Sequence, residues 1–384
     1  MKFYPLASSN WGKEEVLAIK KVIKSDRYTM GEEVKKFEYQ ISKFYGVNHA
    51  IMFNSGSSAN LIMIASLFEL GLIKKGDEVI VPAVSWSTTY FPLHQYGLKI
   101  IFVDTDKFGK IDEENVVKAI SKKTRVIFNV NLLGFPSELN TLKRIAKKNN
   151  LILIEDNCES FGSIHSKKKA GTFGLMGSLS FFYSHHITTM EGGMILTNNQ
   201  KISEYAKSLR AHGWLRDLPL KNKVYNKTGN PFQDSFKFVL PGYSVRPLEF
   251  SAAIGLVQLK KWNKQKKQRL ENAKIFCKLL GDKLKYQIPN FDKYSTWFGF
   301  PIIFKSRKDR DKAVKIFTLN GIECRPVVAG NFTKQPVIKK MNYRIFGKLI
   351  NADNIDECGL FLGNDHRNLK KQLHKVQELL DYEI

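Results

Sequence analysis

The stretch Leu151-Ile152-Leu153-Ile154-Glu155-Asp156 joins four consecutive apolar residues to two carboxylates. A short, continuous apolar run is typical of a strand that is buried on both faces, as in a parallel sheet covered by helices. In such sheets, ligands bind at the carboxyl ends of the strands. The stretch therefore predicts an α/β fold with Glu155 and Asp156 at a ligand-binding edge, although a strand-end turn or a metal site would use the same residues.

Further apolar runs on both sides of this stretch extend the predicted sheet. Helical patterns near residues 58–71, 113–121 and 140–149 separate several of them. Strands that alternate with helices in this way form a mostly parallel sheet with helices on both faces. The additional predicted strands are Glu78–Val81, Lys99–Val103, Arg125–Asn129, Ser178–Tyr183 and Met194–Thr197.

The regions before and after the sheet have a different character. Amphipathic patterns predict helices over Lys13–Lys24 and Glu32–Tyr45. A helix at 201–212 is followed by an irregular stretch from Trp214 to Pro241, which is long enough to be a functional loop or an interface arm. A long helical pattern then runs from Arg246 to about Gly281.

A smaller α+β segment follows this long helix. Because 384 residues are too many for one ordinary core, we expect two domains, a large α/β domain over residues 1–250 and a small C-terminal domain over 251–384. The elements predicted in the small domain are a strand at Trp297–Phe304, a helix at Lys308–Leu319, a strand at Gly321–Cys324 and a helix near 367–380.

The formal charge of the chain is +25, which raises the question of a polyanionic partner. The basic residues are spread along the chain at helical spacing beside apolar residues, as on solvated helix faces, and no nucleic-acid-binding motif is present. We therefore expect no nucleic-acid partner, and one pocket for an anionic small molecule. Salt-sensitive retention on DNA would support the alternative.

The four cysteines, Cys158, Cys277, Cys324 and Cys358, are far apart and form no CxxC pair. This spacing predicts free thiols in a reducing compartment and no metal site. The N-terminus lacks the apolar segment of a signal peptide, and the longest apolar stretch, Leu61–Ile73, is too short to span a bilayer. We expect a cytoplasmic protein with no membrane partner.

Two further motifs carry polar groups. Asn54-Ser55-Gly56-Ser57-Ser58-Ala59-Asn60 follows an apolar run and opens a helix, so its backbone N–H groups suit a phosphate, although serine-rich helix caps are common. Ser180–Gly193 runs from a strand through a polar turn that contains His185 and His186. A histidine at such a turn can act as a general base, although most histidines are structural.

The order of the three motifs resembles fold-type I pyridoxal-phosphate enzymes, and more closely the DegT/DnrJ/EryC1/StrS family of sugar aminotransferases. The resemblance covers nearly the whole chain and includes Tyr28-Thr29-Met30-Gly31, Val81-Pro82-Ala83, Arg210-Ala211-His212-Gly213, Gly242-Tyr243-Ser244-Val245-Arg246 and Ala253–Leu259. It implies an aspartate-aminotransferase-like fold, with a large domain around a mostly parallel sheet and a smaller C-terminal α+β domain. It also implies a homodimer with shared active sites.

One departure from the family pattern concerns the catalytic group. The family turn carries a lysine that forms the Schiff base with the cofactor, but here that position is His185, and no lysine occurs from Gly171 to Gln200. Imidazole cannot form that bond, but it can exchange a proton near neutral pH. The chain therefore resembles the sugar 3-dehydratases of this family, which hold pyridoxal or pyridoxamine phosphate (PLP or PMP) without a covalent link.

Known members of that subgroup act on GDP-4-keto-6-deoxymannose or on a CDP-4-keto-6-deoxyhexose. The CDP enzymes hold an iron–sulfur cluster through cysteines that include a C-x-C pair, which is absent here. The stretches Arg325–Phe332 and Gly363–His366 look like the GDP type, so we expect removal of the C3 oxygen of GDP-4-keto-6-deoxymannose in dideoxysugar (O-antigen type) biosynthesis. L-glutamate would restore PMP, and ammonia would be released.

Three alternatives stay open. They are a nucleotide-sugar aminotransferase in which another lysine substitutes, a CDP-4-keto-6-deoxyglucose 3-dehydratase without the cluster, and an inactive family member with a regulatory role. Intact Asp156, Glu159 and phosphate cradle argue against the last of these.

The resemblance also implies roles for individual residues. His185 would be the catalytic base, Asp156 would pair with the pyridine nitrogen of the cofactor, and Glu159 would lie near its ring hydroxyl. Trp86 would stack on the ring, with core packing as the alternative. Gly56, Ser57 and Ser180 would hold the phosphate.

Three more positions depend on less specific matches. Ser244 replaces a family Asn that reaches the partner subunit's cofactor phosphate, so that contact is in doubt. Arg325 and His366 are candidate substrate contacts, and a surface arginine and a helix-capping histidine are equally good interpretations.

Overall fold

A computed structural model of the chain describes residues 3–281 and 283–383. Within these residues the largest sheet has eight strands in the order β1-β9-β8-β5-β4-β2-β3-β13. The pairings from β8 to β13 are parallel, and β9 is antiparallel to its neighbours β1 and β8, which confirms a mostly parallel sheet. The strands are β1 (His49–Phe53), β2 (Glu78–Pro82), β3 (Lys99–Val103), β4 (Thr124–Val130), β5 (Ile152–Asp156), β8 (Met176–Ser180), β9 (Gly193–Thr197) and β13 (Tyr343–Ile345).

Helices cover both faces of this sheet, as the continuous apolar strands require. Successive residues of a strand point to opposite faces, so Val79 and Val81 pack in one cluster with Ile62. Ile80 packs on the other face with Leu142. The helices around the sheet are α3 (Gly56–Glu69), α4 (Ser87–Gln95), α5 (Glu113–Ala119), α6 (Leu139–Lys148) and α7 (Gln200–Arg210).

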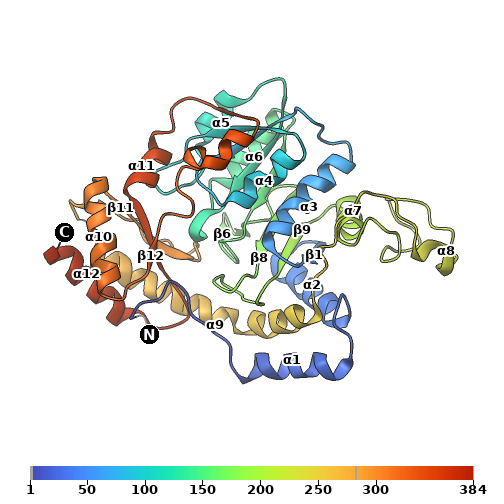
Figure 1. The fold of residues 1–384 in the computed structure, drawn as a ribbon, viewed down its shortest axis with the longest axis horizontal. Helices are drawn as coiled ribbons and strands as arrows, with labels where there is room; N and C mark the ends of the chain where they lie inside the picture. Colours follow the sequence, from blue (N-terminus) through green and yellow to red (C-terminus); the bar gives the residue numbers. More distant parts are fainter. Residues whose placement is uncertain (1–2, 282, 384) are drawn as a thin grey trace.

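The long helix α9 (Glu249–Leu280, 32 residues) runs along one side of the molecule and leads from the large sheet to the C-terminal part (Figure 1). It packs on α1 (Lys13–Ser25) and α2 (Glu32–Tyr45). The Glu249 carboxylate accepts hydrogen bonds from the first N–H groups of α2 and from Gly31. Although α9 is long, no helix among the described residues is apolar enough over a sufficient length to cross a membrane.

A second, smaller sheet lies in the C-terminal part of the described chain, with four antiparallel strands in the order β10-β11-β14-β12. Its strands are β10 (Tyr286–Gln287), β11 (Gly299–Phe304), β12 (Cys324–Arg325) and β14 (Gly359–Gly363), and its helices are α10 (Arg307–Leu319), α11 (Ile350–Cys358) and α12 (Lys370–Glu383). This is the predicted small α+β unit, but β13 from the same part of the sequence extends the large sheet. The expected boundary at residue 250 stays a prediction, and residues 1–2, 282 and 384 of the expected domains lie outside the described residues.

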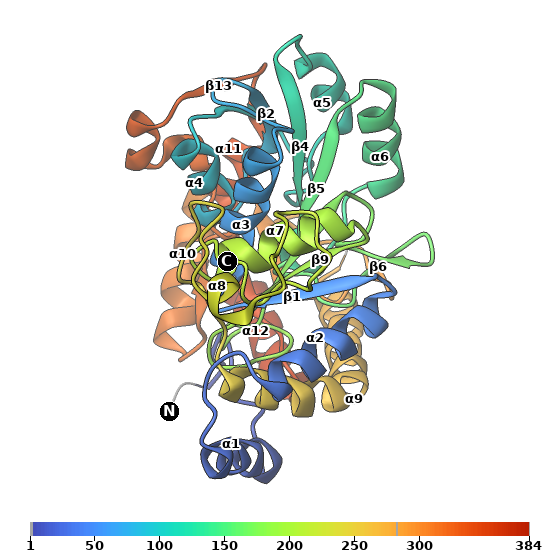
Figure 2. The ribbon, with the colours of Figure 1, turned by 90° about the vertical axis from the view of Figure 1, so that its right-hand side faces the viewer.

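The segment between α7 and α9 stands out from the body of the molecule (Figure 1), and in Figure 2 it lies in front of the body, toward the viewer. It is largely irregular, as predicted, apart from the short helix α8 (Pro231–Ser235). Several of its aromatic side chains face solvent, and Phe232 is 90% exposed. An exposed apolar surface of this kind fits the expected interface arm.

The sequence analysis did not predict α4, α11, β13 or β14. Pro92 lies inside α4, and α11 combines acidic and apolar residues without a clear apolar stripe. The strand β14 contains glycine at both ends, which weakens the strand signal. The predicted strand Ser178–Tyr183 is shifted to Met176–Ser180, because the chain turns away from the sheet after Ser180.

Candidate active site

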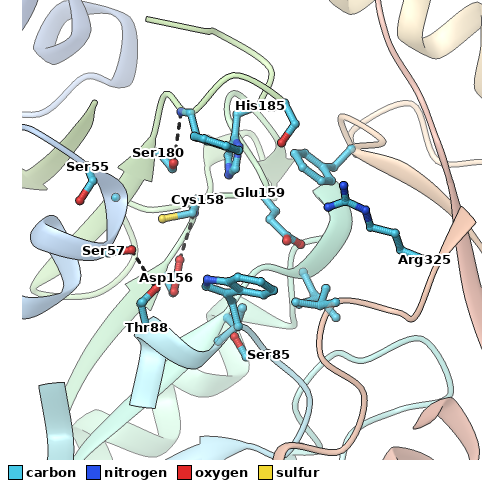
Figure 3. Close-up of a pocket in the computed structure, with 18 of the residues that line it drawn as sticks. Ser55, Ser57, Ser85, Thr88, Asp156, Cys158, Glu159, Ser180, His185 and Arg325 are labelled. Carbon is cyan, nitrogen blue, oxygen red and sulfur yellow. Dashed lines mark hydrogen bonds between the residues drawn. The ribbon is translucent and has the colours of Figure 1, made fainter. Parts of the chain in front are cut away.

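A cavity of about 360 Å³ lies where the carboxyl ends of β5 and β8 meet the N-termini of α3 and α4. Residues of the C-terminal part close it from the other side, and Figure 3 shows Arg325 entering opposite Ser55 and Ser57. Most of the candidate residues from the sequence analysis line this cavity. They are Gly56, Ser57, Trp86, Asp156, Glu159, Ser180, His185 and Arg325.

The first turn of α3 forms one end of the cavity. The Ser55 hydroxyl caps the helix by accepting a hydrogen bond from the Ser58 N–H at 3.0 Å. The first N–H groups of a helix have no partner within the helix, and the helix dipole makes this end attractive to anions. A side chain in place of Gly56 would lie 2.6 Å from Ser180 Cβ and 3.0 Å from Cys158 Sγ. Glycine therefore lets the start of α3 pack closely on Ser180 and Cys158, so that the helix N-terminus and Ser180 line the same end of the cavity.

Two carboxylates end strand β5 and point to opposite faces of the sheet. Asp156 lines the cavity, and its Oδ2 accepts hydrogen bonds of 2.8 Å from Asn60 and from Thr89. Glu155 is fully buried elsewhere and holds the loop at 171–174 by accepting from three backbone N–H groups. The alternation along the strand thus decides which carboxylate faces a ligand.

Trp86 precedes α4 and lines the cavity with 57% of its surface exposed. A large exposed aromatic residue at a cavity wall offers a flat surface for a planar ligand. This exposure disagrees with core packing, which was the alternative interpretation of Trp86.

Glu159 lies beside Asp156 at the cavity wall, and its Oε2 accepts a hydrogen bond of 2.9 Å from the Leu133 N–H. Burial, together with the nearby Asp156 charge, raises the pKa of the Glu159 carboxyl to about 7. Near neutral pH this carboxyl is thus part protonated and can donate or accept a hydrogen bond.

The polar turn between β8 and β9 holds His185 over the cavity (Figure 3). The turn is closed by hydrogen bonds from the Phe181 N–H to the Gly192 carbonyl and from the Thr189 N–H to the Phe181 carbonyl. The N-terminal segment also holds it, because the Trp11 indole N–H donates to the Thr188 hydroxyl at 3.0 Å.

His185 and His186 point in different directions. His186 is buried, packs against Trp262 and Phe298, and contacts the Thr296 carbonyl through Nε2, so it is structural. The His185 ring packs edge-on against Phe298, and its Nδ1 is buried with no hydrogen-bond partner among the described residues. Burial and the nearby Arg269 charge lower the pKa of His185 to about 4. At neutral pH the ring is therefore uncharged and can accept a proton.

Two candidate residues do not line the main cavity. Ser244 is exposed and bridges to Ala211 in a single antiparallel pairing, so its proposed contact across a dimer stays a prediction. His366 lies behind His185, at a separate small cavity.

Sequence reasoning missed several residues of the site. Asn60 lies within the quoted cradle motif, but Thr88 and Thr89 lie on α4, which was not predicted. Leu6 and Phe298 come from segments far away in the sequence, so only the folded chain brings them to the cavity.

The four cysteines are free. Across residues 3–281 and 283–383, no three His, Cys, Asp or Glu side chains are grouped to hold a metal ion. The expectation that the protein needs no metal stays a prediction.

The cavity suits a ligand that has a phosphate group, a planar ring and a protonated ring nitrogen, such as PLP or PMP. The helix N-terminus at Gly56, the exposed face of Trp86 and the fixed carboxylate of Asp156 supply the three kinds of contact that such a group needs. No lysine is found among the described residues that line the cavity, so none of these residues can bind the cofactor through an amine.

This fold and this set of residues define the pyridoxal-phosphate enzymes of fold-type I. A family model matches residues 9–380, and the chain belongs to the DegT/DnrJ/EryC1/StrS aminotransferase family. The chain is 47% identical to GDP-4-keto-6-deoxy-D-mannose 3-dehydratase of Escherichia coli O55:H7, over 98% of this chain and 99% of that protein. It is 46% identical to the enzyme of the same name from Yersinia pseudotuberculosis, over 98% of each chain.

A solved structure of such an enzyme has nearly the same fold. The crystal structure of GDP-4-keto-6-deoxymannose-3-dehydratase with a trapped PLP-glutamate geminal diamine matches with a TM-score of 0.96 and 47% identity. The match covers 98% of this chain and 100% of that one. The predicted aspartate-aminotransferase-like fold and family are therefore confirmed.

Proposed function

We propose that this protein is a PLP- and PMP-dependent 3-dehydratase that removes the C3 oxygen of GDP-4-keto-6-deoxymannose. The observation that carries the proposal is His185 in the cavity, at the position of the family lysine, with no lysine among the described lining residues. The two relatives named above carry this activity in their names and match nearly full length. The reaction would serve dideoxysugar biosynthesis, with L-glutamate as the amino donor.

The cavity residues would bind the cofactor without a covalent link. Gly56, Ser57 and Ser180 would hold the phosphate at the N-terminus of α3, where unpaired N–H groups favour an anion. Asp156 would pair with the ring nitrogen, and Trp86 would cover one face of the ring. The bound cofactor supplies an electron sink for the loss of the hydroxyl group.

His185 would move the protons of the reaction. Its neutral ring can accept a proton at Nε2 and return it to the leaving hydroxyl group or to the solvent. Arg325 lies at the mouth of the cavity and offers a positive charge to the nucleotide diphosphate. His366 would act only indirectly, because it lies behind His185.

A homodimer with shared active sites completes the proposal. The exposed aromatic arm around α8 and the exposed Ser244 support an interface in this region. Free cysteines support a reducing, cytoplasmic location.

The test is an incubation of the purified holoenzyme with GDP-4-keto-6-deoxymannose, with and without L-glutamate. Glutamate-dependent release of ammonia, together with a sugar that has lost its C3 oxygen and contains no nitrogen, is the expected result. An amino sugar would instead establish an aminotransferase. Turnover of the CDP-linked sugar alone would change the nucleotide but keep the reaction.

A further inference from the structure

A second, separate cavity is also lined by His185, and we call it the cavity behind His185. It is small, about 10 Å³, which is on the order of the volume that one water molecule needs. It is formed by the N-terminal segment, the polar turn, α9 and the loop after β14. The residues that matter for the argument are Asn10, His185, Arg269 and Asp365.

Three buried polar atoms of residues that line this cavity have no hydrogen-bond partner among the described residues. They are Asn10 Oδ1, His185 Nδ1 and Arg269 Nε. A buried polar atom without a partner is costly. Three of them at one small cavity indicate a polar ligand of the size of water.

Arg269 is unusual in its own right. Its side chain is only 5% exposed, and its Nη1 donates to the backbone carbonyls of Asn364 at 2.6 Å and Trp297 at 3.4 Å. The neighbouring Asp365 carboxylate is already bound by Arg367 and by the Ser8 hydroxyl. The Nε–H of this buried cation is therefore available to a ligand in the cavity.

We propose that the small cavity binds one ordered water, which accepts hydrogen bonds from Arg269 Nε–H and His185 Nδ1–H and donates one to Asn10 Oδ1. Arg269 Nε can only donate and Asn10 Oδ1 can only accept, so the water must accept from the first and donate to the second. The water then has one lone pair and one hydrogen left, and its lone pair takes the Nδ1–H of His185, because the proposed general base needs the lone pair of the ring on Nε2. All three unpartnered atoms become paired, with a number of bonds typical of buried water.

The water site holds the proton of the His185 ring on Nδ1. This inference rests on the proposed function, in which His185 is the general base. With the proton on Nδ1, the lone pair of the neutral ring is on Nε2, which is the nitrogen left to serve the main cavity. When Nε2 takes a proton, Nδ1–H remains a donor and the water need not turn. Such preorganised hydrogen bonding is what a proton-transfer site requires. Arg269 and Asn10 are therefore positioning residues.

The direct test is a crystal structure of the holoenzyme at about 1.5 Å, together with ¹⁵N NMR of histidine-labelled holoenzyme. We expect one water within hydrogen-bond distance of the three atoms, and a neutral His185 whose proton is on Nδ1. The signal of His185 is assigned by its loss in the variant His185→Asn. Missing density for the water, or a proton on Nε2 in place of Nδ1, would overturn the proposal.

Variants of Asn10 supply the functional test. Asn10→Leu fills the cavity and should lower kcat by about 10- to 100-fold, as does loss of an outer partner of other oriented imidazoles, while KM for the sugar nucleotide stays within about twofold. Asn10→Asp keeps an acceptor oxygen and should retain the water, the Nδ1–H tautomer and most of the activity. Asn290→Leu, the same change at an exposed asparagine away from both cavities, is the matched control and should behave like the unaltered protein.

These measurements separate the proposed function from the proposed water site. The water and the tautomer are observed without substrate, so their presence in a protein without dehydratase activity would contradict the proposed function alone. Dehydratase activity in a protein without the water, or an Asn10→Leu variant with unchanged kcat and tautomer, would contradict the inference alone.

Discussion

Two parts of the main cavity differ in how far the protein satisfies their polar groups with hydrogen bonds. One part is the floor, around Asp156 at the end of β5, and the other is the polar turn that carries His185. On the floor, both oxygens of Asp156 are engaged, by Asn60, by Thr89 and by the Cys158 N–H. On the turn, His185 Nδ1 has no partner within the described chain. Protein hydrogen bonds therefore fix Asp156 before any ligand binds, whereas no described protein group holds the His185 ring through Nδ1.

This difference separates the residues that hold the cofactor from the residue that transfers protons. A group that only holds a cofactor gains from fixed hydrogen bonds, because its orientation then needs no adjustment. A group that transfers protons must change its protonation state, so a strong hydrogen bond from the protein to the reacting nitrogen, Nε2 of His185, would oppose it. Substitutions on the floor should thus affect stability and cofactor binding together, and substitutions on the turn should affect turnover alone.

The largest effect is expected for His185→Asn. Loss of the general base should reduce ammonia release by about 10²- to 10⁴-fold. The free energy of unfolding should change by less than about 1 kcal/mol, because the described contacts of the ring are packing contacts with Phe298 and Phe182. Steady-state assays and urea denaturation measure the two quantities.

The control for His185→Asn is His94→Asn, an exposed histidine at the surface end of α4. It should leave turnover and stability unchanged. Should His185→Asn keep more than a tenth of the activity, the base would have to be another residue.

Asp156→Ala should produce the opposite pattern. It removes the acceptor of Asn60 and Thr89 and leaves both donors buried, so the free energy of unfolding should fall by about 1–3 kcal/mol. Cofactor affinity should fall as well, by on the order of a hundredfold for a lost charge-assisted bond. Asp156→Asn keeps a carbonyl oxygen at the site, so it should restore most of the free energy of unfolding but not the affinity for the cofactor. Urea denaturation measures the first quantity, and titration of the protein with cofactor, followed by absorbance, measures the second. Equal stability of the two variants would contradict a preorganised floor.

Trp86→Ala tests the wall of the cavity and should have a smaller effect. Loss of an offset stacking contact of about 0.5–1.5 kcal/mol should weaken cofactor binding by about 2- to 12-fold. Because Trp86 is 57% exposed, stability should hardly change, and Trp86→Phe should recover most of the affinity. A large loss of stability would mean that Trp86 belongs to the core after all.

The last prediction concerns the pH dependence of stability that Glu159 causes. Its pKa is raised to about 7 in the folded chain, so the folded state binds more protons than the unfolded state between the ordinary carboxyl pKa and about pH 7. Its contribution to stability is present at low pH and is lost as pH rises through this window, by at most roughly 3.5 kcal/mol. The difference in stability between the unaltered protein and Glu159→Gln should therefore shift in favour of Glu159→Gln as pH rises. A difference that is constant from pH 5 to 8 would show that Glu159 titrates normally.

Much of this cavity was predictable because its floor is local in sequence. The strand that ends at Asp156, the cradle around Gly56 and the polar turn with His185 each form a continuous motif, and their order indicated the family. The strand predicted at Lys99–Val103 has the same bounds in the structure. Continuous apolar runs also predicted a sheet with helices on both faces.

The residues that the sequence did not reveal act across long separations. Asn10 and Arg269 line the same small cavity as His185 although 259 residues separate them in the sequence. No local pattern distinguishes Arg269 from the other basic residues of α9, because its burial follows from tertiary packing. The apolar pattern alone likewise left Glu155 and Asp156 open, since a shift by one residue exchanges the two faces, and only the family resemblance chose Asp156.

Because α9 is long and uninterrupted, a small tilt at its first turn displaces residues further along the helix by a larger distance. Glu249, near its start, caps α2, while Arg269 lies 20 residues further on behind the active site. At 1.5 Å per residue these positions are about 30 Å apart, so a tilt of about one degree at the first moves the second by about 0.5 Å, the tolerance of a catalytic arrangement. The packing of α1 and α2 on α9 therefore helps to determine the position of Arg269 beside His185. Substitutions on the surfaces of α1 and α2 that contact α9 are thus expected to change the catalytic rate although they lie far from the cavity.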